Sequence, residues 1–253
     1  MTTLTPTKQS QAEDERDDIE RRALTFFRRL YREQGERTLA VIDDADEAEL
    51  ERRIAELYTD EPARGANEFF RFWQPIAVAV GVSALLGLPG DAGGGGLNDA
   101  GNGLSDPFND DLTRYLREMS RLFGDRYSQS SLEATFGVIQ NWRDEGGTVA
   151  DLRRQLAPVW SGPRPNAAAT TETTRIVNQT RVNAWSEVGV WGYRLQTAGD
   201  GVVSAGGRVR DHHQERADNG PYPIGDPQGI APVDGDVNCR CLNFPVVENP
   251  NAN

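Results

Sequence analysis

The amino-acid sequence predicts a predominantly helical α+β protein, with an extended N-terminal helical region followed by a small C-terminal α+β domain of short strands and long loops. Apolar residues recur at helical spacing along most of the chain up to Gly189. Beyond Gly189 the spacing shortens towards alternation, and Gly, Pro and Asp become dense from Pro221 to Val237. A hydrophobic fraction of 37% and a mean hydropathy of -0.60 are low for a compact globule, and they favour an elongated shape, disordered ends, or both.

The N-terminal helical region is expected over residues 14–89. Apolar side chains on one stripe predict a first amphipathic helix over Asp14–Asp43, and a second stripe predicts another helix over Ala45–Leu57. Residues 1–13 are polar, so we expect them to be disordered, and their lack of an apolar core argues against a signal peptide.

The most apolar run of the chain is Pro75–Pro89. At about 15 residues it falls short of the roughly 20 that a helix needs to span a bilayer. A buried core helix is therefore preferred over a membrane span, and no membrane partner is expected.

A glycine-rich segment follows over residues 90–106, with consecutive glycines from Gly93 to Gly96. Glycine loses the most conformational entropy on ordering, so the segment is expected to be a flexible loop or hinge. A phosphate-binding loop is the alternative, but the segment lacks the Gly-Lys-Ser/Thr ending that places a lysine and a hydroxyl on the phosphates.

A second helical region is expected over residues 107–160. One apolar face predicts a helix over Asp110–Leu122. The segment Ser130–Glu133 reads Ser-x-x-Glu, which predicts the capped start of a further helix that ends near Gly146. Thr148 is expected to cap the helix after it.

The C-terminal domain is expected over residues 161–247, after a break rich in Gly and Pro, and residues 248–253 form a polar tail. Its first element is a helix over Thr171–Gly189, and the segment Pro221–Val237 is expected to be an irregular surface loop. Alternating or β-branched residues predict short strands at Val190–Thr197, Val202–Val203 and Leu242–Val246.

The net charge of -12 at pH 7 argues against a chain that coats nucleic acid by itself, because such binding needs Lys and Arg to neutralise phosphates. A free DNA-binding module is accordingly disfavoured, since the sequence offers no basic stripe. Any contact with DNA must be local.

Both histidines and both cysteines lie in one C-terminal stretch. They belong to Arg208-Val209-Arg210-Asp211-His212-His213 and to Asn238-Cys239-Arg240-Cys241. Zinc prefers imidazole and thiolate ligands, so a zinc site is one interpretation of this clustering, although one Cys-x-Cys differs from the spacing of a zinc finger. The alternative is a pair of packed cysteines with a surface histidine pair.

The same two segments, in this order and separated by a loop with Gly and Pro, resemble the signature of the phage Mu F-like head morphogenesis family. His213 occupies the place of the single histidine of that family. Thr171–Arg175 is similar to the Arg-Thr-Glu helix of the family, with Thr170 where an arginine is usual. The resemblance covers roughly Tyr115 to Val247.

This resemblance implies a minor capsid protein of a tailed virus that is bound to the portal protein inside the head and supports head assembly or genome packaging and ejection. The chain would then lie in the virion near the portal vertex, and in the host cytoplasm during assembly. The major capsid protein and packaged viral DNA are further candidate partners, and no enzymatic activity is implied.

For the site, residue type and clustering make His213, Cys239 and Cys241 candidate metal ligands, with Asp211 as a further candidate and zinc as the metal. Four more residues form the expected structural motif: Arg208, Arg210, Asn238 and Arg240. The arginines would tie loops to carboxylates, or alternatively face packaged DNA.

A metal-dependent HNH-like nuclease is the enzymatic alternative. Asp211, His212 and His213 would supply a general base and a metal ligand, and the cysteines would hold structural zinc. This alternative is disfavoured because no histidine follows His213 to complete a catalytic metal pair.

Overall fold

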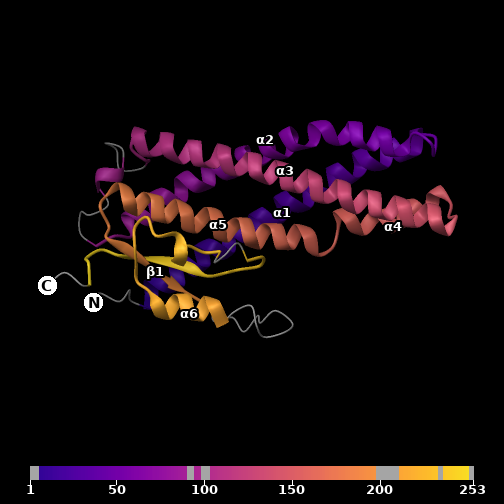
Figure 1. Ribbon diagram of the computed structural model, residues 1–253. Helices are drawn as coiled ribbons and strands as arrows, with labels where there is room; N and C mark the ends of the chain where they lie inside the picture. The colour runs from indigo at the N-terminus through magenta and orange to yellow at the C-terminus, as the bar shows by residue number, and fades with distance from the viewer. Residues whose placement is uncertain (1–5, 90–93, 98–102, 198–210, 233–235, 251–253) are drawn as a thin grey trace. The chain divides into compact units, whose positions relative to one another are not determined.

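The computed structural model describes residues 6–89, 94–97, 103–197, 211–232 and 236–250 (Figure 1). The described residues confirm a predominantly helical α+β protein. The helices are α1 (Pro6–Asp44), α2 (Leu50–Leu86), α3 (Asp106–Glu145), α4 (Val149–Trp160), α5 (Pro163–Glu187) and α6 (Asp211–Asn219), with the 3-10 turns η1 (Gly94–Gly96) and η2 (Pro227–Gly229). The strands are β1 (Gly192–Gln196), β2 (Tyr222–Pro223) and β3 (Leu242–Val246).

The chain divides into two compact units that are discontinuous in sequence. Unit 1 comprises Met1–Ala23, Pro75–Thr113 and Ala169–Asn253, and unit 2 comprises Leu24–Gln74 and Arg114–Ala168. The sequence instead suggested successive segments along the chain, with a C-terminal domain over 161–247. Long helices explain the difference, because α1, α2, α3 and α5 each contribute residues to both units.

The first two long helices extend beyond their predicted bounds. Helix α1 begins at Pro6, so the predicted disorder is wrong for residues 6–13, and residues 1–5 lie outside the described part. Helix α2 is one helix where separate helices over Ala45–Leu57 and Pro75–Pro89 were expected. Pro62 and Pro75 lie inside it, so tertiary packing outweighs the backbone donor that each proline removes.

The apolar end of α2 lies in unit 1 with Ile76, Val80 and Leu85 buried, as expected for a core helix. Within the described residues, α2 is also the one helix that passes a test for membrane spans by length and composition. An 18-residue window of it has a mean hydropathy of 1.5, and 39% of that window is buried. That no membrane partner exists stays a prediction.

Helix α3 replaces the two helices predicted between residues 107 and 146. The predicted capping box at Ser130–Glu133 is wrong, because these residues lie in the middle of α3. There the Ser130 hydroxyl donates to the carbonyl oxygen of Tyr127 at 3.3 Å, so it bonds to its own helix instead of starting a new one.

The signals at the end of α3 are confirmed. Gly146 has a φ of 70°, in the left-handed region that ends a helix with little strain in glycine. Thr148 is the N-cap of α4, and its hydroxyl accepts a hydrogen bond from the amide of Asp151 at 3.2 Å.

The glycine-rich segment 90–106 is only partly described. Its described residues contain η1 and an isolated bridge between Leu97 and Leu104. Residues 90–93 and 98–102 lie outside the described part, so the predicted flexibility stays a prediction.

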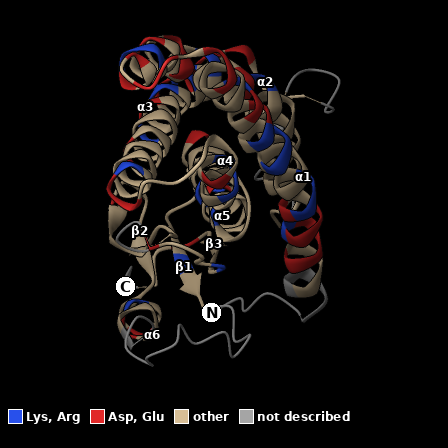
Figure 2. Cartoon of the chain, turned by 90° about the vertical axis from the view of Figure 1, so that its right-hand side faces the viewer, with Lys and Arg blue, Asp and Glu red and all other residues tan. Residues whose placement is uncertain are grey.

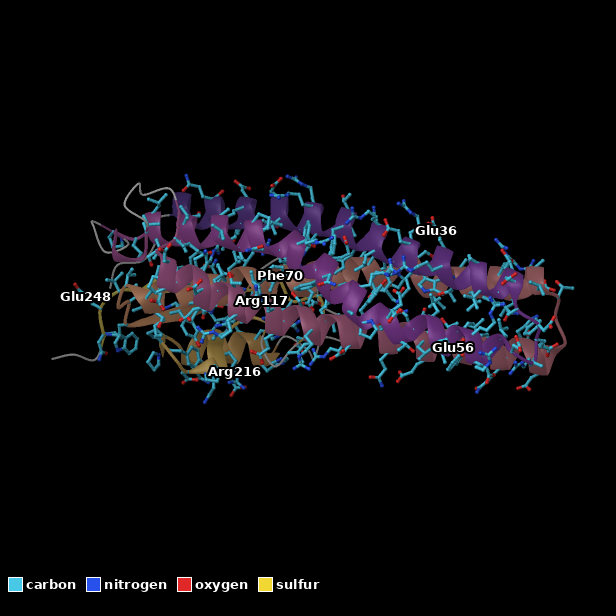
Figure 3. The ribbon with its side chains drawn as sticks, turned by 90° about the horizontal axis from the view of Figure 1, so that it is seen from above. Glu36, Glu56, Phe70, Arg117, Arg216 and Glu248 are labelled. Carbon is cyan, nitrogen blue, oxygen red and sulfur yellow. The ribbon has the colours of Figure 1, made fainter. Side chains whose placement is uncertain are left out.

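Unit 2 is a helical unit with an aromatic core. Phe69 stacks on Phe123 with ring centroids 4.6 Å apart, and the Tyr127 hydroxyl donates to the carbonyl oxygen of Leu30 at 3.1 Å. Nearer the surface, the Arg117 guanidinium lies 5.8 Å from the ring centroid of Phe70, and the two labelled side chains lie together in Figure 3. Aromatic burial on this scale holds unit 2 together.

Acidic and basic residues are both present along α1, α2 and α3 (Figure 2). Several form i,i+4 ion pairs, such as Arg29 with Glu33 and Arg52 with Glu56. Such exposed pairs contribute little to stability, so these faces are best interpreted as solvated surfaces.

Unit 1 contains a small antiparallel sheet in the order β2-β1-β3, formed by the described strands beside α5 (Figure 1). The predicted strand Leu242–Val246 is β3 with the same bounds, and the strand predicted at Val190–Thr197 corresponds to β1. Val202–Val203 lies outside the described residues. Helix α6 and strand β2 were not predicted, and β2 lies within the predicted irregular loop.

Candidate metal centre

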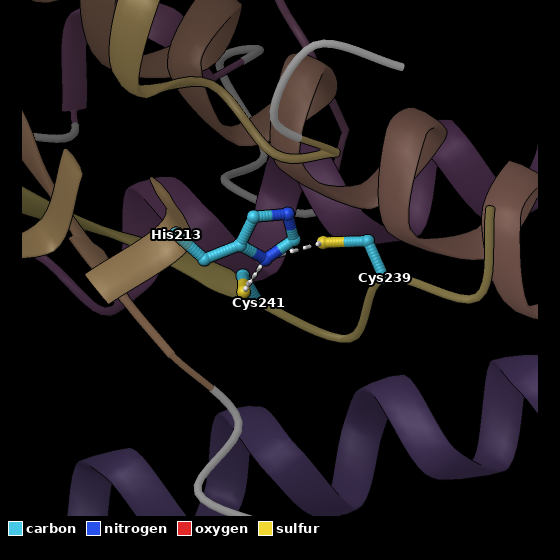
Figure 4. Close-up of side chains that lie close together, drawn as sticks. All are labelled: His213, Cys239 and Cys241. Carbon is cyan, nitrogen blue, oxygen red and sulfur yellow. Dashed lines mark hydrogen bonds between the residues drawn. The ribbon is translucent and has the colours of Figure 1, made fainter. Parts of the chain in front are cut away.

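His213, Cys239 and Cys241 meet in the core of unit 1 (Figure 4). His213 is the third residue of α6, and the cysteines lie in the segment just before β3. The His213 Nδ1 atom lies 3.3 Å from the Cys241 Sγ atom and 3.9 Å from the Cys239 Sγ atom. Each of the three residues exposes only 3% of its surface.

These side chains form a possible metal-binding cluster. One nitrogen of His213 and the two cysteine sulfurs all lie within 4.8 Å of one another. Three buried soft ligand atoms at this separation are compatible with a metal ion, because a metal accepts the lone pairs of imidazole and thiolate. The two cysteines form no disulfide.

The electrostatics of the cluster favour the ligating form of Cys239. A hydrogen bond from Cys241 and a weaker effect of His213 lower the pKa of Cys239 to about 5, against the opposing effect of burial. In return, the hydrogen bond with Cys239 raises the pKa of His213. The lowered pKa of Cys239 favours its thiolate, which is the form that binds metals.

A polar stripe on α5 holds the cysteine segment in place. The Thr171 hydroxyl accepts a hydrogen bond from the Asn238 amide at 3.0 Å, and the Thr174 hydroxyl donates to the Cys239 carbonyl oxygen. The Asn178 side chain donates to the Cys241 carbonyl oxygen at 2.9 Å. These residues are three and four positions apart, so they share one helix face.

The start of α1, which also belongs to unit 1, contacts the same segment. Arg240 forms an ion pair with Glu20, with 2.7 Å between its Nη2 atom and the carboxylate oxygen Oε1. Arg16 donates to the carbonyl oxygen of Arg240 at 2.5 Å. Arg240 thus ties a loop to a carboxylate. This is the first of the two roles expected for the motif arginines, the other being contact with packaged DNA.

The other predicted site residues have mixed outcomes. Asn238 has a φ of 61° and turns the chain just before Cys239. Asp211 is the first residue of α6, but its side chain lies outside the described part of the chain. Arg208 and Arg210 lie outside the described residues altogether.

No sequence pattern indicated Asp236, which lies beside both histidines in the structure. Its Oδ2 atom lies 2.8 Å from His213 Nε2 and 3.0 Å from His212 Nε2. Asp236 belongs to the loop that was expected to be irregular surface, where one Asp among several carries no signal of its partner. The sequence does carry a signal for the α5 stripe, since the spacing of Thr171, Thr174 and Asn178 places them on one face of a helix.

The three ligand residues are all buried, and they form an incomplete tetrahedral set. Structural zinc takes four ligands in a tetrahedron, and the described residues supply three in this group. The side chains present therefore fit a soft metal with one position left to a further ligand.

Comparisons with other proteins identify no relative: no protein-family model matches the chain, and neither a curated protein nor a solved structure matches it significantly.

Proposed function

We propose that this chain is a non-catalytic minor head protein of a tailed virus, with a C-terminal part that a structural zinc ion holds together. The observation that carries the proposal is that three segments resembling parts of the Mu F-like signature lie in contact with one another. The Asn-Cys-Arg-Cys segment contacts His213 on one side and the Thr171–Arg175 helix on the other. Residues that make such contacts act as structural cross-links.

Zinc is the metal that the donor set favours. Imidazole nitrogen with two thiolates is a soft set, which suits zinc and disfavours magnesium and calcium, since both of those prefer oxygen ligands. Bound zinc would fasten α6 to the segment before β3. These two parts of the chain are separated by the loop that contains β2 and η2.

Elemental analysis of the purified chain tests the zinc assignment. We expect about one zinc ion per chain, because the three ligand residues form a site for a single ion. Cys239→Ser and Cys241→Ser should each lose the metal, whereas the control Glu215→Gln on the exposed face of α6 should retain it. Metal-free wild-type protein whose thermal stability is unchanged by a chelator would contradict the assignment.

The head-protein assignment predicts where the chain is found and what it binds. We expect it in purified virions and in assembling heads of the virus that encodes it, in few copies, and we expect the portal protein to retain it when the two are co-expressed. Mass spectrometry of both particle types measures the first, and co-purification measures the second. Absence of the chain from both particle types would exclude this function.

The nuclease alternative makes a different prediction. It requires metal-dependent cleavage of plasmid DNA that His213→Ala abolishes. The geometry gives it little support, because the Nε2 atoms of His212 and His213 both lie within 3.0 Å of one Asp236 oxygen, so the two histidines share a single carboxylate. Interspersed charges on the long helices likewise give little support to a DNA-binding module.

A further inference from the structure

One carboxylate oxygen, Asp236 Oδ2, lies between the two histidines of the chain. It is 2.8 Å from the Nε2 atom of His213 and 3.0 Å from the Nε2 atom of His212. His213 is buried, whereas the side chains of Asp236 and His212 are 24% and 33% exposed. Asp236 therefore sits between the buried cluster and the surface of unit 1.

The ligand atoms of His212, His213 and Asp236 lie within 4.8 Å of one another, so this group too is close enough to hold a metal ion. The contact of His213 with Asp236 is a hydrogen bond of 2.8 Å, a normal length for a ring nitrogen and a carboxylate oxygen. The contact of His212 with the same oxygen is an ion-pair contact of 3.0 Å. We therefore describe the group as a carboxylate held between two imidazoles.

We propose that Asp236 is the positioning residue of the metal centre and that His212 holds Asp236 in place. When the Nε2–H group of His213 donates a hydrogen bond to Asp236, the proton stays on Nε2 and the Nδ1 atom carries the lone pair. Nδ1 is also the atom that faces both sulfurs. The carboxylate thus sets the tautomer and the ring orientation that a metal needs. This inference rests on the metal centre proposed above.

The second histidine completes the arrangement. The rings of His212 and His213 meet edge to face, with centroids 4.5 Å apart and an interplanar angle of 88°. This packing directs both Nε2 atoms to one oxygen, so His212 restrains the carboxylate without facing the sulfurs. Loss of His212 should therefore act only through Asp236.

Zinc affinity of full-length variants tests this role by competition with a chromogenic chelator. Asp236→Asn should weaken zinc binding roughly 10- to 100-fold, the usual effect of removing such a partner. Asp236→Glu should restore part of the loss. The matched control is Asp218→Asn, which removes a carboxylate of α6 that accepts a hydrogen bond from Gln214 at 2.8 Å.

A spectroscopic measurement separates positioning from general destabilisation. In the zinc-loaded wild type, long-range proton–nitrogen spectra should show His213 protonated at Nε2, with slow exchange of that proton. Asp236→Asn should speed the exchange, and Asp218→Asn should not. His212→Ala should weaken zinc binding less than Asp236→Asn, and the double variant should bind like Asp236→Asn alone, because both act through one group.

The possible results distinguish this inference from the centre itself. Wild-type affinity and proton exchange in Asp236→Asn would overturn the positioning role while leaving the zinc centre intact. Full additivity of His212→Ala and Asp236→Asn would overturn the role of His212. A wild-type chain that takes up no zinc would instead refute the centre, and this is measured on the wild type before any variant is compared.

Discussion

Asn238 adopts a backbone conformation that few residues tolerate. Its φ of 61° lies in the left-handed region, where the Cβ atom of most L-residues approaches the backbone too closely. Asparagine and glycine occupy this region most readily. The turn at Asn238 directs its amide to Thr171 and brings the next residue, Cys239, towards His213.

The conformation of Asn238 predicts a simple pair of outcomes. Asn238→Ala should lower the free energy of unfolding by about 1 to 2 kcal/mol, the cost of placing a residue with a Cβ atom in this region. Asn238→Gly should lower it less, because glycine adopts the turn without that cost. Urea unfolding of both variants measures the difference, and equal stability of the two would show that backbone strain is not the reason for asparagine here.

At the residue scale, the sequence identified ligand types but not their partners. His213, Cys239 and Cys241 were candidates because every soft ligand of the chain lies in one stretch, and the structure brings them together. Asp236 was missed, since its hydrogen bond to His213 spans 23 positions and depends on the path of an irregular loop. No local pattern encodes such a contact.

Two glycines of α3 differ sharply in their surroundings. A Cβ atom built on Gly124 would lie 2.2 Å from the backbone carbonyl oxygen of Pro62 in α2, within unit 2. Gly137 is exposed on the same helix, and a Cβ atom there would meet nothing within 4 Å. Gly124 is thus required for the close approach of α2 and α3, whereas Gly137 is not.

Alanine at these positions should have opposite effects. Gly137→Ala should raise the free energy of unfolding by roughly 0.5 to 1 kcal/mol, because alanine favours the helix. Gly124→Ala should lower it by about 1 to 3 kcal/mol, because the contacted atom belongs to a backbone that cannot turn aside. Thermal and urea unfolding check both values; a Gly124→Ala chain as stable as the wild type would refute the close approach.

At the element scale, residue patterns typical of helix ends predicted real helix ends only where the chain also changes direction. Gly146 and Thr148 end one helix and start the next, as their residue types predict. The Ser130–Glu133 pattern starts no helix, since the Ser130 hydroxyl bonds within α3. Capping motifs describe what a helix start needs, but continued packing on both sides keeps the helix intact.

At the scale of the whole molecule, charge and domain division bear on partners. The acidic residues that give the net charge of -12 are spread along the helices among many arginines, so we expect any recognition of DNA to be local. The compact units are built from residues far apart in sequence, so neither unit corresponds to a single continuous segment. Binding experiments therefore call for the full chain.

Local sequence signals were enough to predict the helical α+β class, the bounds of β3, the turn at Gly146 and the stretch that holds the soft ligands. These features depend on residues near one another in the chain, where periodicity and residue type act directly. Contacts between distant segments set the rest: the continuity of α2 and α3, the hydrogen bonds of Thr171, Thr174 and Asn178 to the cysteine segment, and the position of Asp236 between the two histidines. Such contacts arise only when the chain folds, and they outweigh local preferences where the two disagree.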